Sequence, residues 1–410
     1  MNETLREDAL TVIRGAIRRV LPEEAVRRAL EGRRFPGDTV LVSVGKAAWT
    51  MADAAVRTLG PPRRGVVITK YSHSRGEIPG CGCFEAGHPV PDENSFAATR
   101  RALEAVRGLT ERDTVLFLLS GGGSALFEDP LVPPEDLRDV TERLLACGAD
   151  IVEINTIRKR LSGVKGGRFA RQCAPARVFA VILSDILGDP VDMIASGPAA
   201  PDSATCADAM AVVKKHGLRF SETVMECLGR ETPKALDNVE TVITGSVREL
   251  CTAAAEECRR LGYEPRILTD SLACEAREAG AWLGDLAREH AADGKALALI
   301  AGGETVVRLT GKGKGGRNQE LALSAAERIV GLPNVCVFSV GSDGTDGPTD
   351  AAGGIADGET KARLEALGIS IPAVLADNDA YHALEKAGGL VITGPTGTNV
   401  NDVAAALIRG

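Results

Sequence analysis

The chain alternates short, unbroken apolar runs with longer segments of helical periodicity, and this alternation constrains its fold more than any other feature. Five such runs, each ending in a glycine-containing turn, lie at 39–47, 65–70, 114–125, 178–190 and 241–250. A continuous apolar run is typical of a strand covered on both faces, whereas a half-exposed strand alternates apolar and polar residues. The pattern therefore predicts a parallel β-sheet flanked by helices, which is an α/β fold.

A second series of apolar runs indicates a second domain of the same class. These runs lie at 264–270, 295–309, 336–347 and 389–402. The 410 residues also exceed the roughly 250–300 at which one core stops growing. We expect α/β domains over 1–235 and 236–410, with the boundary in the polar stretch 228–240. Two helices, interrupted at Pro22, are expected over residues 3–31.

Charge, aromatic content and cysteine spacing narrow the range of partners. A net charge of −8 and an aromatic content of 3% argue against nucleic acid, which needs a basic face and stacking side chains. The ten cysteines lack paired C-x-x-C spacing, so we expect reduced thiols and a cytoplasmic protein. A metal site at Cys81 and Cys83 is a weaker alternative. There is no apolar run of about 18 residues and no leader pattern, so no membrane association is expected.

A glycine loop directly after the run at 114–125 is the first candidate site. It contains Ser120, Gly121, Gly122, Gly123 and Ser124. Backbone N–H groups and hydroxyls in such a loop can bind phosphate oxygens. Glycines also occur there simply because a turn needs positive φ. The loop matches neither G-x-G-x-x-G nor a P-loop.

Charged residues after other strands suggest partners for a transferring phosphoryl group. Lys46 follows the first strand, where its ammonium can stabilise phosphoryl transfer or simply lie in solvent. A basic cluster follows at 158–168, with Arg158 and Arg160 as candidates for holding a carboxylate or phosphates and Asn155 preceding them as a possible cap. Asp189 follows a later strand, where a carboxylate can reach a metal or a substrate hydroxyl or serve only the loop.

The second domain carries two further candidate loops. The segment at 302–320 combines glycines with Lys312, Lys314 and Arg317 before a helix, which indicates a mobile anion clamp. An oxygen-rich loop at 341–350 contains Asp343 and Asp346, which suit Mg²⁺ or nucleotide hydroxyls without matching an EF-hand. Since no G-x-S-x-G elbow and no H-E-x-x-H motif occurs, the inventory favours phosphoryl transfer over hydrolase chemistry.

Taken in order, these segments resemble the glycerate 2-kinases, whose C-terminal part is the MOFRL domain. The resemblance extends over essentially the whole chain and rests on the following motifs: VGKAAWTMA, LSGGGSAL, EINTIRKRLSGVKGGRFA, LSDILGDPVDMIASGP, GGETVVRLTGKGKGGRNQE, SVGSDGTDGPTDAAGG and TGPTGTNVND. It implies a Rossmann-like first domain, a smaller second α/β domain and an active site in the cleft between them. It also implies transfer of the ATP γ-phosphoryl group to the 2-hydroxyl of D-glycerate with Mg²⁺.

The resemblance also suggests roles for individual residues. Lys46 would stabilise the phosphoryl group, Asp189 would act as a base or metal-linked carboxylate, and Arg317 would act as a clamp. We place the nucleotide near residues 120–124 and the glycerate carboxylate near Arg158 or Arg160, with Asn155 as a further substrate-binding residue, although the two loops could exchange these roles. Asp343, with Asp189, is the expected metal ligand.

Two alternatives belong to other classes. Relatives of this family have been labelled hydroxypyruvate reductases, but the chain lacks the dinucleotide glycine pattern that a nicotinamide enzyme needs. A non-catalytic protein that binds nucleotide and sugar acid is the other alternative. In that case Lys46 and Asp189 would be dispensable. A homodimer is possible.

Overall fold

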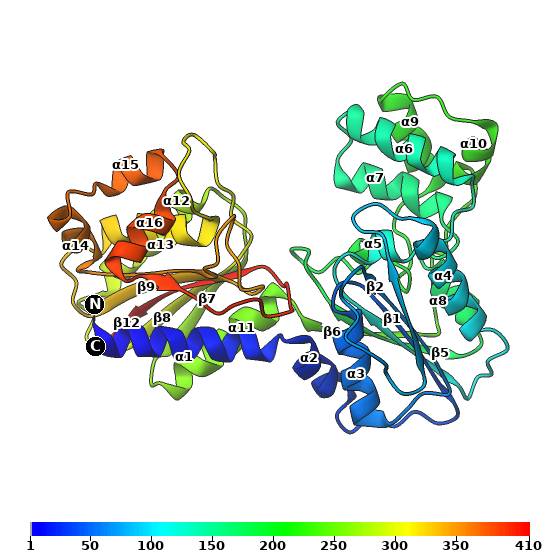
Figure 1. The fold of residues 1–410 in the computed structure, drawn as a ribbon, viewed down its shortest axis with the longest axis horizontal. Helices are drawn as coiled ribbons and strands as arrows, with labels where there is room; N and C mark the ends of the chain where they lie inside the picture. The colour runs from blue at the N-terminus through cyan, green and yellow to red at the C-terminus, as the bar shows by residue number, and fades with distance from the viewer. Residues whose placement is uncertain (1) are drawn as a thin grey trace. The chain divides into compact units, whose positions relative to one another are not determined.

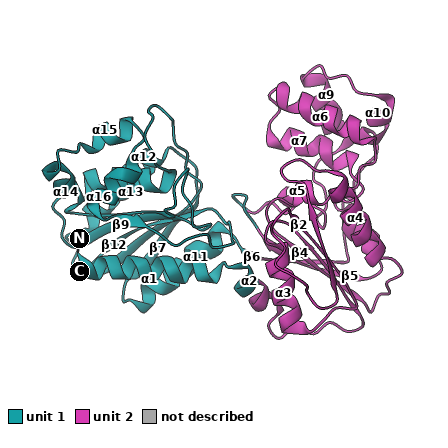
Figure 2. Ribbon diagram, in the orientation of Figure 1, with its two compact units in different colours: residues 1–25, 184–188, 245–410 teal, residues 26–183, 189–244 magenta. Residues whose placement is uncertain are grey.

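The computed structural model describes residues 2–410, which form two compact units (Figures 1 and 2). Unit 1 comprises residues 2–25, 184–188 and 245–410, and unit 2 comprises residues 26–183 and 189–244. The expected boundary near 235 lies close to the change of unit at 244–245. The sequence did not predict that residues 2–25 and 184–188 would belong to the same unit as the C-terminal part.

Unit 2 contains a six-stranded sheet in the order β3-β2-β1-β4-β5-β6. The pairs from β3 to β5 are parallel. The strands are β1 (Thr39–Val44), β2 (Arg64–Lys70), β3 (Cys81–Ala86), β4 (Thr114–Leu119), β5 (Arg177–Leu183) and β6 (Val239–Gly245). This is the strand order of a dinucleotide-type doubly wound sheet, in which ligands bind where the order reverses, between β1 and β4. The expected Rossmann-like parallel sheet is confirmed.

Helices cover this sheet, and a small helical layer extends from it. They are α2 (Pro22–Leu30), α3 (Ala48–Leu59), α4 (Glu93–Ala105), α5 (Gly123–Leu126), α6 (Pro134–Ala146), α7 (Ile151–Arg158), η1 (Lys159–Leu161), α8 (Arg168–Cys173), η2 (Ile194–Ser196), α9 (Cys206–Lys215) and α10 (Glu222–Leu228). Helices α6, α7, α9 and α10 have their own apolar core, which includes Leu137, Ile157 and Val212 (Figure 1). This layer places α7 within reach of the loop that precedes α5.

Unit 1 contains a mixed sheet in the order β11-β10-β9-β12-β8-β7. Its strands are β7 (Glu264–Leu272), β8 (Leu297–Gly303), β9 (Val335–Gly341), β10 (Gly353–Asp357), β11 (Leu390–Val391) and β12 (Asp402–Ile408). Only β7 and β8 are parallel, and β12 is inserted antiparallel between β8 and β9. The run expected at 389–402 provides only the two-residue β11, while the chain's last seven-residue strand begins at Asp402.

Helices pack on both faces of the second sheet. They are α1 (Glu3–Arg19), α11 (Val247–Arg260), α12 (Ala276–His290), α13 (Arg317–Arg328), α14 (Thr360–Ala366), α15 (Ile371–Ala376) and α16 (Ala380–Ala387). Helix α1 packs beside α11, and its apolar side, including Leu5, Val12 and Ile13, shares a core with Phe338 of β9 (Figure 1). The amphipathic start of the chain therefore completes unit 1.

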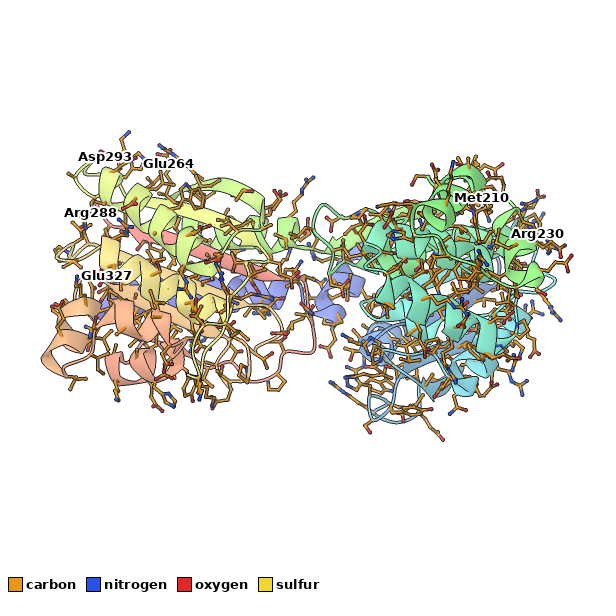
Figure 3. The ribbon with its side chains drawn as sticks, turned by 90° about the horizontal axis from the view of Figure 1, so that it is seen from above. Met210, Arg230, Glu264, Arg288, Asp293 and Glu327 are labelled. Carbon is orange, nitrogen blue, oxygen red and sulfur yellow. The ribbon has the colours of Figure 1, made fainter. Side chains whose placement is uncertain are left out.

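The surface carries interspersed charges of both signs. Arg230, Glu264 and Asp293 are exposed and labelled in Figure 3. Among residues 2–410, we find no helix with the length and apolarity required to cross a bilayer.

Candidate active site

The glycine loop of unit 2 lies at the switch point of the sheet, beside the residues that follow β1. The Lys46 amide donates to the Gly121 carbonyl over 2.9 Å, and the Ala47 amide donates to the Ser120 hydroxyl over 3.1 Å. Gly45 allows this approach, because a side chain there would overlap Ser120. The Ser120 hydroxyl therefore joins the two loops and is not free to bind a ligand.

The backbone amides of residues 121–124 have no acceptor within residues 2–410. Gly122 has φ +84 and precedes the short helix α5, so several N–H groups are available where the loop turns. Successive free N–H groups in such a turn form an anion-binding concavity. The predicted role of Gly121, Gly122 and Gly123 thus has a physical basis in their main chain.

Cationic side chains flank this loop. Lys46 is exposed and makes no side-chain hydrogen bond or ion pair within residues 2–410. A Cβ on Gly122 would lie 2.9 Å from the His88 imidazole and 3.2 Å from the Lys46 Cγ. Burial lowers the pKa of His88, and the charges of Lys46, Lys70 and His73 lower it further. Both sequence and structure therefore support Lys46 as an anion-binding group.

His88 also borders the glycine loop, and the sequence analysis did not identify it there. It follows β3, which lies next to β2, and β3 was not predicted as a strand. Its burial pattern is largely intermediate because it is the edge strand. The strand-end position of His88 would have identified it if this strand had been recognised.

The other side of the loop contacts α7 and the segment that precedes β6. The Ser124 hydroxyl lies 3.0 Å from the Ser196 hydroxyl, which donates to Asn155 Oδ1 over 2.8 Å. Ser196 is fully buried, Asn155 is 6% exposed, and Ser124 is half-buried. The structure therefore brings Asn155 to the glycine loop and adds Ser196, which the sequence analysis did not identify.

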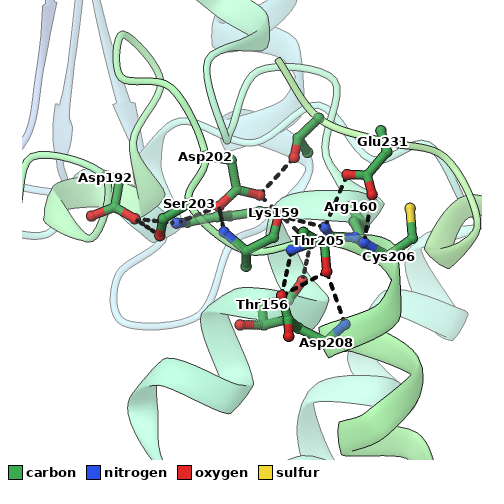
Figure 4. Close-up of polar contacts among 12 residues, drawn as sticks. Thr156, Lys159, Arg160, Asp192, Asp202, Ser203, Thr205, Cys206, Asp208 and Glu231 are labelled. Atoms are coloured by element: carbon green, nitrogen blue, oxygen red, sulfur yellow. Dashed lines mark hydrogen bonds and ion pairs between the residues drawn. The ribbon is translucent and has the colours of Figure 1, made fainter. Parts of the chain in front are cut away.

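The two candidate arginines have different environments. Arg160 is fully buried, donates to the carbonyls of Thr156 and Ala204, and lies 3.5 Å from Asp202 (Figure 4). Arg158, at the end of α7, is half-buried and has no hydrogen bond or ion pair within residues 2–410. Arg160 thus stabilises the fold and is not available for the predicted carboxylate contact, because its guanidinium is enclosed by protein acceptors.

Arg158 lies one helical turn after Asn155, so the two side chains share a face of α7. Beside them is a fully buried ion pair between Lys165 and Glu128. Burial lowers the pKa of Lys165 to about 8; the Glu128 charge opposes this shift, and the Arg158 charge adds to it. The positive charge of Arg158 thus acts on Lys165, and no ion pair of Arg158 is found within residues 2–410.

Asp189 lies in a segment with unusual backbone conformations. Its φ is +52, and Ala195 and Ser196 also have positive φ, at +50 and +61. Asp189 is half-buried, and its carboxylate has no partner within residues 2–410. Non-glycine residues with such backbones are unfavourable and occur preferentially at functional sites. The geometry leaves Asp189 available for a substrate hydroxyl or a metal.

In unit 1, Arg317 is the first residue of α13 and is held by two carboxylates. Its Nε and Nη2 donate to Asp402 over 2.6 and 3.1 Å, and its Nη1 donates to Glu304 over 3.1 Å. Burial alone would lower the pKa of Arg317, but the hydrogen bonds and charge of Asp402 raise it. Arg317 is thus permanently cationic and fixed in place.

The predicted nucleotide or metal carboxylates of unit 1 have local partners. Asp346 is 3% exposed and accepts the amides of Asn318 and Gln319 over 3.1 and 2.9 Å, so it stabilises the start of α13. Burial raises the pKa of Asp346 to about 7, although these two amides oppose the shift. Asp343 is half-buried and accepts the Thr345 amide. The structure therefore gives Asp346 a role in helix capping.

Residues 310–314, which belong to the expected clamp segment at 302–320, are hydrogen-bonded to residues 377–379. Asn378 Oδ1 accepts the amides of Thr310 and Gly311, and the carboxylates of Asp377 and Asp379 accept those of Lys312 and Lys314. A side chain on Gly311 or Gly313 would overlap Asp377 or Asp379. The glycines therefore permit the close approach of two segments, and the amides of this loop are bonded within unit 1.

The candidate residues fit a Mg²⁺ ion that is held mainly by the nucleotide phosphates. No group of three His, Cys, Asp or Glu side chains gathers in the described part of the chain. Asp189 and Asp343 lie in different units. Mg²⁺ normally retains several waters and binds through one or two carboxylates plus substrate phosphates. The unpartnered carboxylate of Asp189 suits that arrangement.

A pocket of about 390 Å³ lies at the opposite edge of the unit 2 sheet. It is lined by residues at the amino ends of β4, β5 and β6, including Thr114, Arg177 and Val239. Ligands of open parallel sheets bind at the carboxyl ends of the strands. We therefore assign the candidate active site to the glycine loop.

Comparison with known proteins places the chain in a family of kinases. Residues 8–229 match a domain of unknown function, DUF4147, and residues 297–402 match the MOFRL family. The D-glycerate 2-kinase of Thermotoga maritima is 52% identical, with 99% of each chain covered, and the glycerate 2-kinase of Pyrococcus horikoshii is 40% identical, with 98% of this chain and 97% of that protein covered. The chain belongs to the glycerate 2-kinase family.

Two further matches complete the comparison. A crystal structure of glycerate kinase from Thermotoga maritima has a TM-score of 0.94 at 51% identity and covers 99% of this chain and 100% of its own. A putative hydroxypyruvate reductase of Agrobacterium vitis is 40% identical, over 91% of this chain and 87% of that protein. The family and the α/β fold expected from the sequence are confirmed.

Proposed function

We propose that this protein transfers the γ-phosphoryl group of ATP to the 2-hydroxyl of D-glycerate, giving 2-phosphoglycerate and ADP. The observation that carries the proposal is the glycine loop at the switch point of the unit 2 sheet. There, free backbone N–H groups lie beside Lys46, a cation without an intramolecular partner. Preorganised donors and cations are the main requirement for phosphoryl transfer.

We assign the phosphate oxygens of ATP to the amides of residues 121–124. Because these N–H groups have no protein acceptor, they bind phosphate without losing a hydrogen bond. Lys46 neutralises charge that develops on the transferring group. Mg²⁺, brought with the nucleotide, would supply further charge neutralisation, with Asp189 as its protein ligand or neighbour.

Glycerate would lie on the α7 side of the loop. Arg158 holds its carboxylate, since this guanidinium is the one in the cluster that lacks a protein partner. Asp189 orients the 2-hydroxyl and takes up its proton as the new P–O bond forms and the bond to ADP breaks. The clamp role expected for Arg317 would require it to exchange a contact with Glu304 or Asp402 for one with the substrate, because both carboxylates hold it. Asp343 remains a proposed contact of the nucleotide or its metal.

A direct test is ³¹P NMR of the products after incubation with D-glycerate, ATP and Mg²⁺. We expect 2-phosphoglycerate with the wild type and almost none with Lys46→Ala or Asp189→Asn. The control is Lys312→Ala, which removes an exposed lysine of the loop at 310–314 in unit 1. A 3-phosphoglycerate signal would overturn the position of transfer.

A second arm tests the reductase alternative by following NADH oxidation with hydroxypyruvate. Reduction without any phosphorylated acid would replace the kinase assignment. Full activity of Lys46→Ala would remove this lysine from the mechanism. The expected homodimer and the cytoplasmic location remain predictions, which size-exclusion chromatography with light scattering and cell fractionation would test.

A further inference from the structure

A chain of three hydrogen-bonding side chains borders the glycine loop, and its direction follows from the groups involved. The Ser196 hydroxyl donates its single proton to Asn155 Oδ1 over 2.8 Å. It has no second proton, so it must accept in its 3.0 Å contact with Ser124. The Ser124 proton is therefore directed toward Ser196, away from any ligand.

This direction determines what Ser124 offers to a substrate. Ser124 is half-buried, and its hydroxyl makes no other hydrogen bond within residues 2–410. The lone pairs that remain accept hydrogen bonds and cannot donate to a phosphate oxygen. Ser124 thus suits a ligand that presents an O–H group, whereas the neighbouring backbone amides suit anionic oxygens.

The backbone around Ser196 supports a positioning role. Ser196 is fully buried at φ +61, a conformation that a residue with a Cβ rarely adopts. Its amide donates to Met193, and its carbonyl accepts the amide of Gly166, so both flanks fix it. A Cβ on Gly123 would lie 2.8 Å from the Cβ of Ala195, which shows how closely this segment packs against the glycine loop.

The chain of hydroxyls can bind a proton donor but cannot remove its proton. It ends at the Asn155 amide, which has no basic site, and neither serine can take up a second proton at neutral pH. The hydroxyl that reacts must lose its proton, and that requires a base such as Asp189. The hydrogen-bonded side chains of Ser124, Ser196 and Asn155 are therefore suited to the substrate hydroxyl that does not react.

We propose that Ser124 accepts a hydrogen bond from the 3-hydroxyl of glycerate, with Ser196 and Asn155 as positioning residues, and that this contact selects acids that carry a second hydroxyl. The inference rests on the proposed function for the identity of the acid. It also reassigns Ser124 from the phosphate group to the acceptor substrate.

Calorimetric binding of acids to the full-length protein in the presence of ADP and Mg²⁺ tests this assignment without turnover. D-Glycerate is compared with D-lactate, which lacks the 3-hydroxyl, and with 3-hydroxypropionate, which lacks the 2-hydroxyl. For the wild type we expect D-lactate to bind about tenfold more weakly than D-glycerate. Ser124→Ala should weaken D-glycerate by about the same factor and leave D-lactate unchanged, so that the two acids bind equally.

Three further variants separate a specific contact from general disruption. Ser196→Ala should reduce the preference for D-glycerate, because Ser124 is then free to rotate. Asn155→Asp retains the acceptor for Ser196, so the preference should persist even if both acids bind more weakly. Ser162→Ala removes a buried hydroxyl that accepts a hydrogen bond from the Val164 amide, and it should keep the wild-type preference.

The outcomes distinguish this inference from the proposed function. Equal weakening of D-glycerate and D-lactate binding in Ser124→Ala would overturn the inference. So would a Ser124→Ala variant that binds 3-hydroxypropionate more weakly but D-glycerate as tightly as the wild type does. If the selectivity follows Ser124 but no phosphorylated acid forms with ATP, the recognition stands and the kinase assignment fails. If the wild type binds no acid, both fail.

Discussion

The glycine-rich loops of the two units use the same residue types in opposite ways. In unit 2, the amides of residues 121–124 and the side chains of Lys46 and Arg158 have no hydrogen-bond or ion-pair partner among residues 2–410. In unit 1, the amides at 310–314 are bonded to Asp377, Asn378 and Asp379, and Arg317 is held by two carboxylates. Both loops are rich in glycine, so the difference between them lies in whether their N–H groups are already paired within the protein.

The largest expected effect on activity comes from removing the ammonium group of Lys46 in unit 2. Lys46→Ala should lower kcat by about 10²- to 10³-fold, because a preorganised charge at the phosphoryl group is lost. Lys312→Ala should change kcat less than about twofold, since this side chain is exposed and only its amide is used by the fold. Coupled-assay kinetics measure both. Similar losses in the two variants would remove the distinction between the loops.

The second comparison concerns two arginines only two residues apart. Arg158→Met should raise the KM for glycerate by about tenfold or more and change the free energy of unfolding by less than about 1 kcal/mol. Arg160→Met should lower that free energy by about 3 kcal/mol, because it leaves Asp202 buried without part of its counter-charge. Denaturant unfolding and steady-state kinetics are measured on the same preparations. Loss of stability in Arg158→Met would contradict the assignment of a free, ligand-binding arginine.

A smaller effect is expected for the carboxylates that hold Arg317. Asp402→Asn should lower the free energy of unfolding by about 1–2 kcal/mol, since a bidentate contact with a 9% exposed carboxylate is weakened. Glu304→Gln is the control: its side chain is 47% exposed, and a change within about 0.5 kcal/mol is expected. Equal effects in urea titrations would mean that Arg317 is not fixed mainly by Asp402.

The smallest expected effect is a dependence on pH at the start of α13. Burial raises the pKa of Asp346 to about 7 from its ordinary value of 3.8. Between these values the folded state binds a proton that the unfolded state does not, so this group's contribution to stability is lost as the pH rises from about 4 to 7. The stability of the wild type relative to Asp346→Asn should therefore be greater at pH 5 than at pH 8. Parallel pH curves in thermal unfolding would contradict this.

The sequence predicted the parallel sheet of unit 2 well but not the completion of unit 1. The strands β1, β2 and β4 are unbroken apolar runs, whereas β12 contains three successive alanines at 404–406, which favour strands poorly. Its place between β8 and β9 depends on tertiary pairing. Likewise, the periodicity of residues 3–19 predicts an amphipathic helix, but the identity of the surface it covers is a long-range property of the fold.

The same limit applies to the site. Strand-end position predicted Lys46, the glycine loop and Asp189, because carboxyl ends of parallel strands meet at one edge. Nothing local in the sequence distinguishes Arg158 from Arg160, since the difference lies in Asp202 and Ala204, more than forty residues later. Ser196 was also beyond reach, as its partners Ser124 and Asn155 are 72 and 41 residues away.

The position of α1 in unit 1 has a consequence for synthesis on the ribosome. Its apolar side, including Leu5, Val12 and Ile13, packs against residues that begin at 247. At about 5–20 residues per second, these partners emerge on the order of tens of seconds after α1. During that interval unit 2 can form its parallel sheet while the apolar side of α1 stays uncovered, so α1 is exposed to non-specific association until unit 1 is complete.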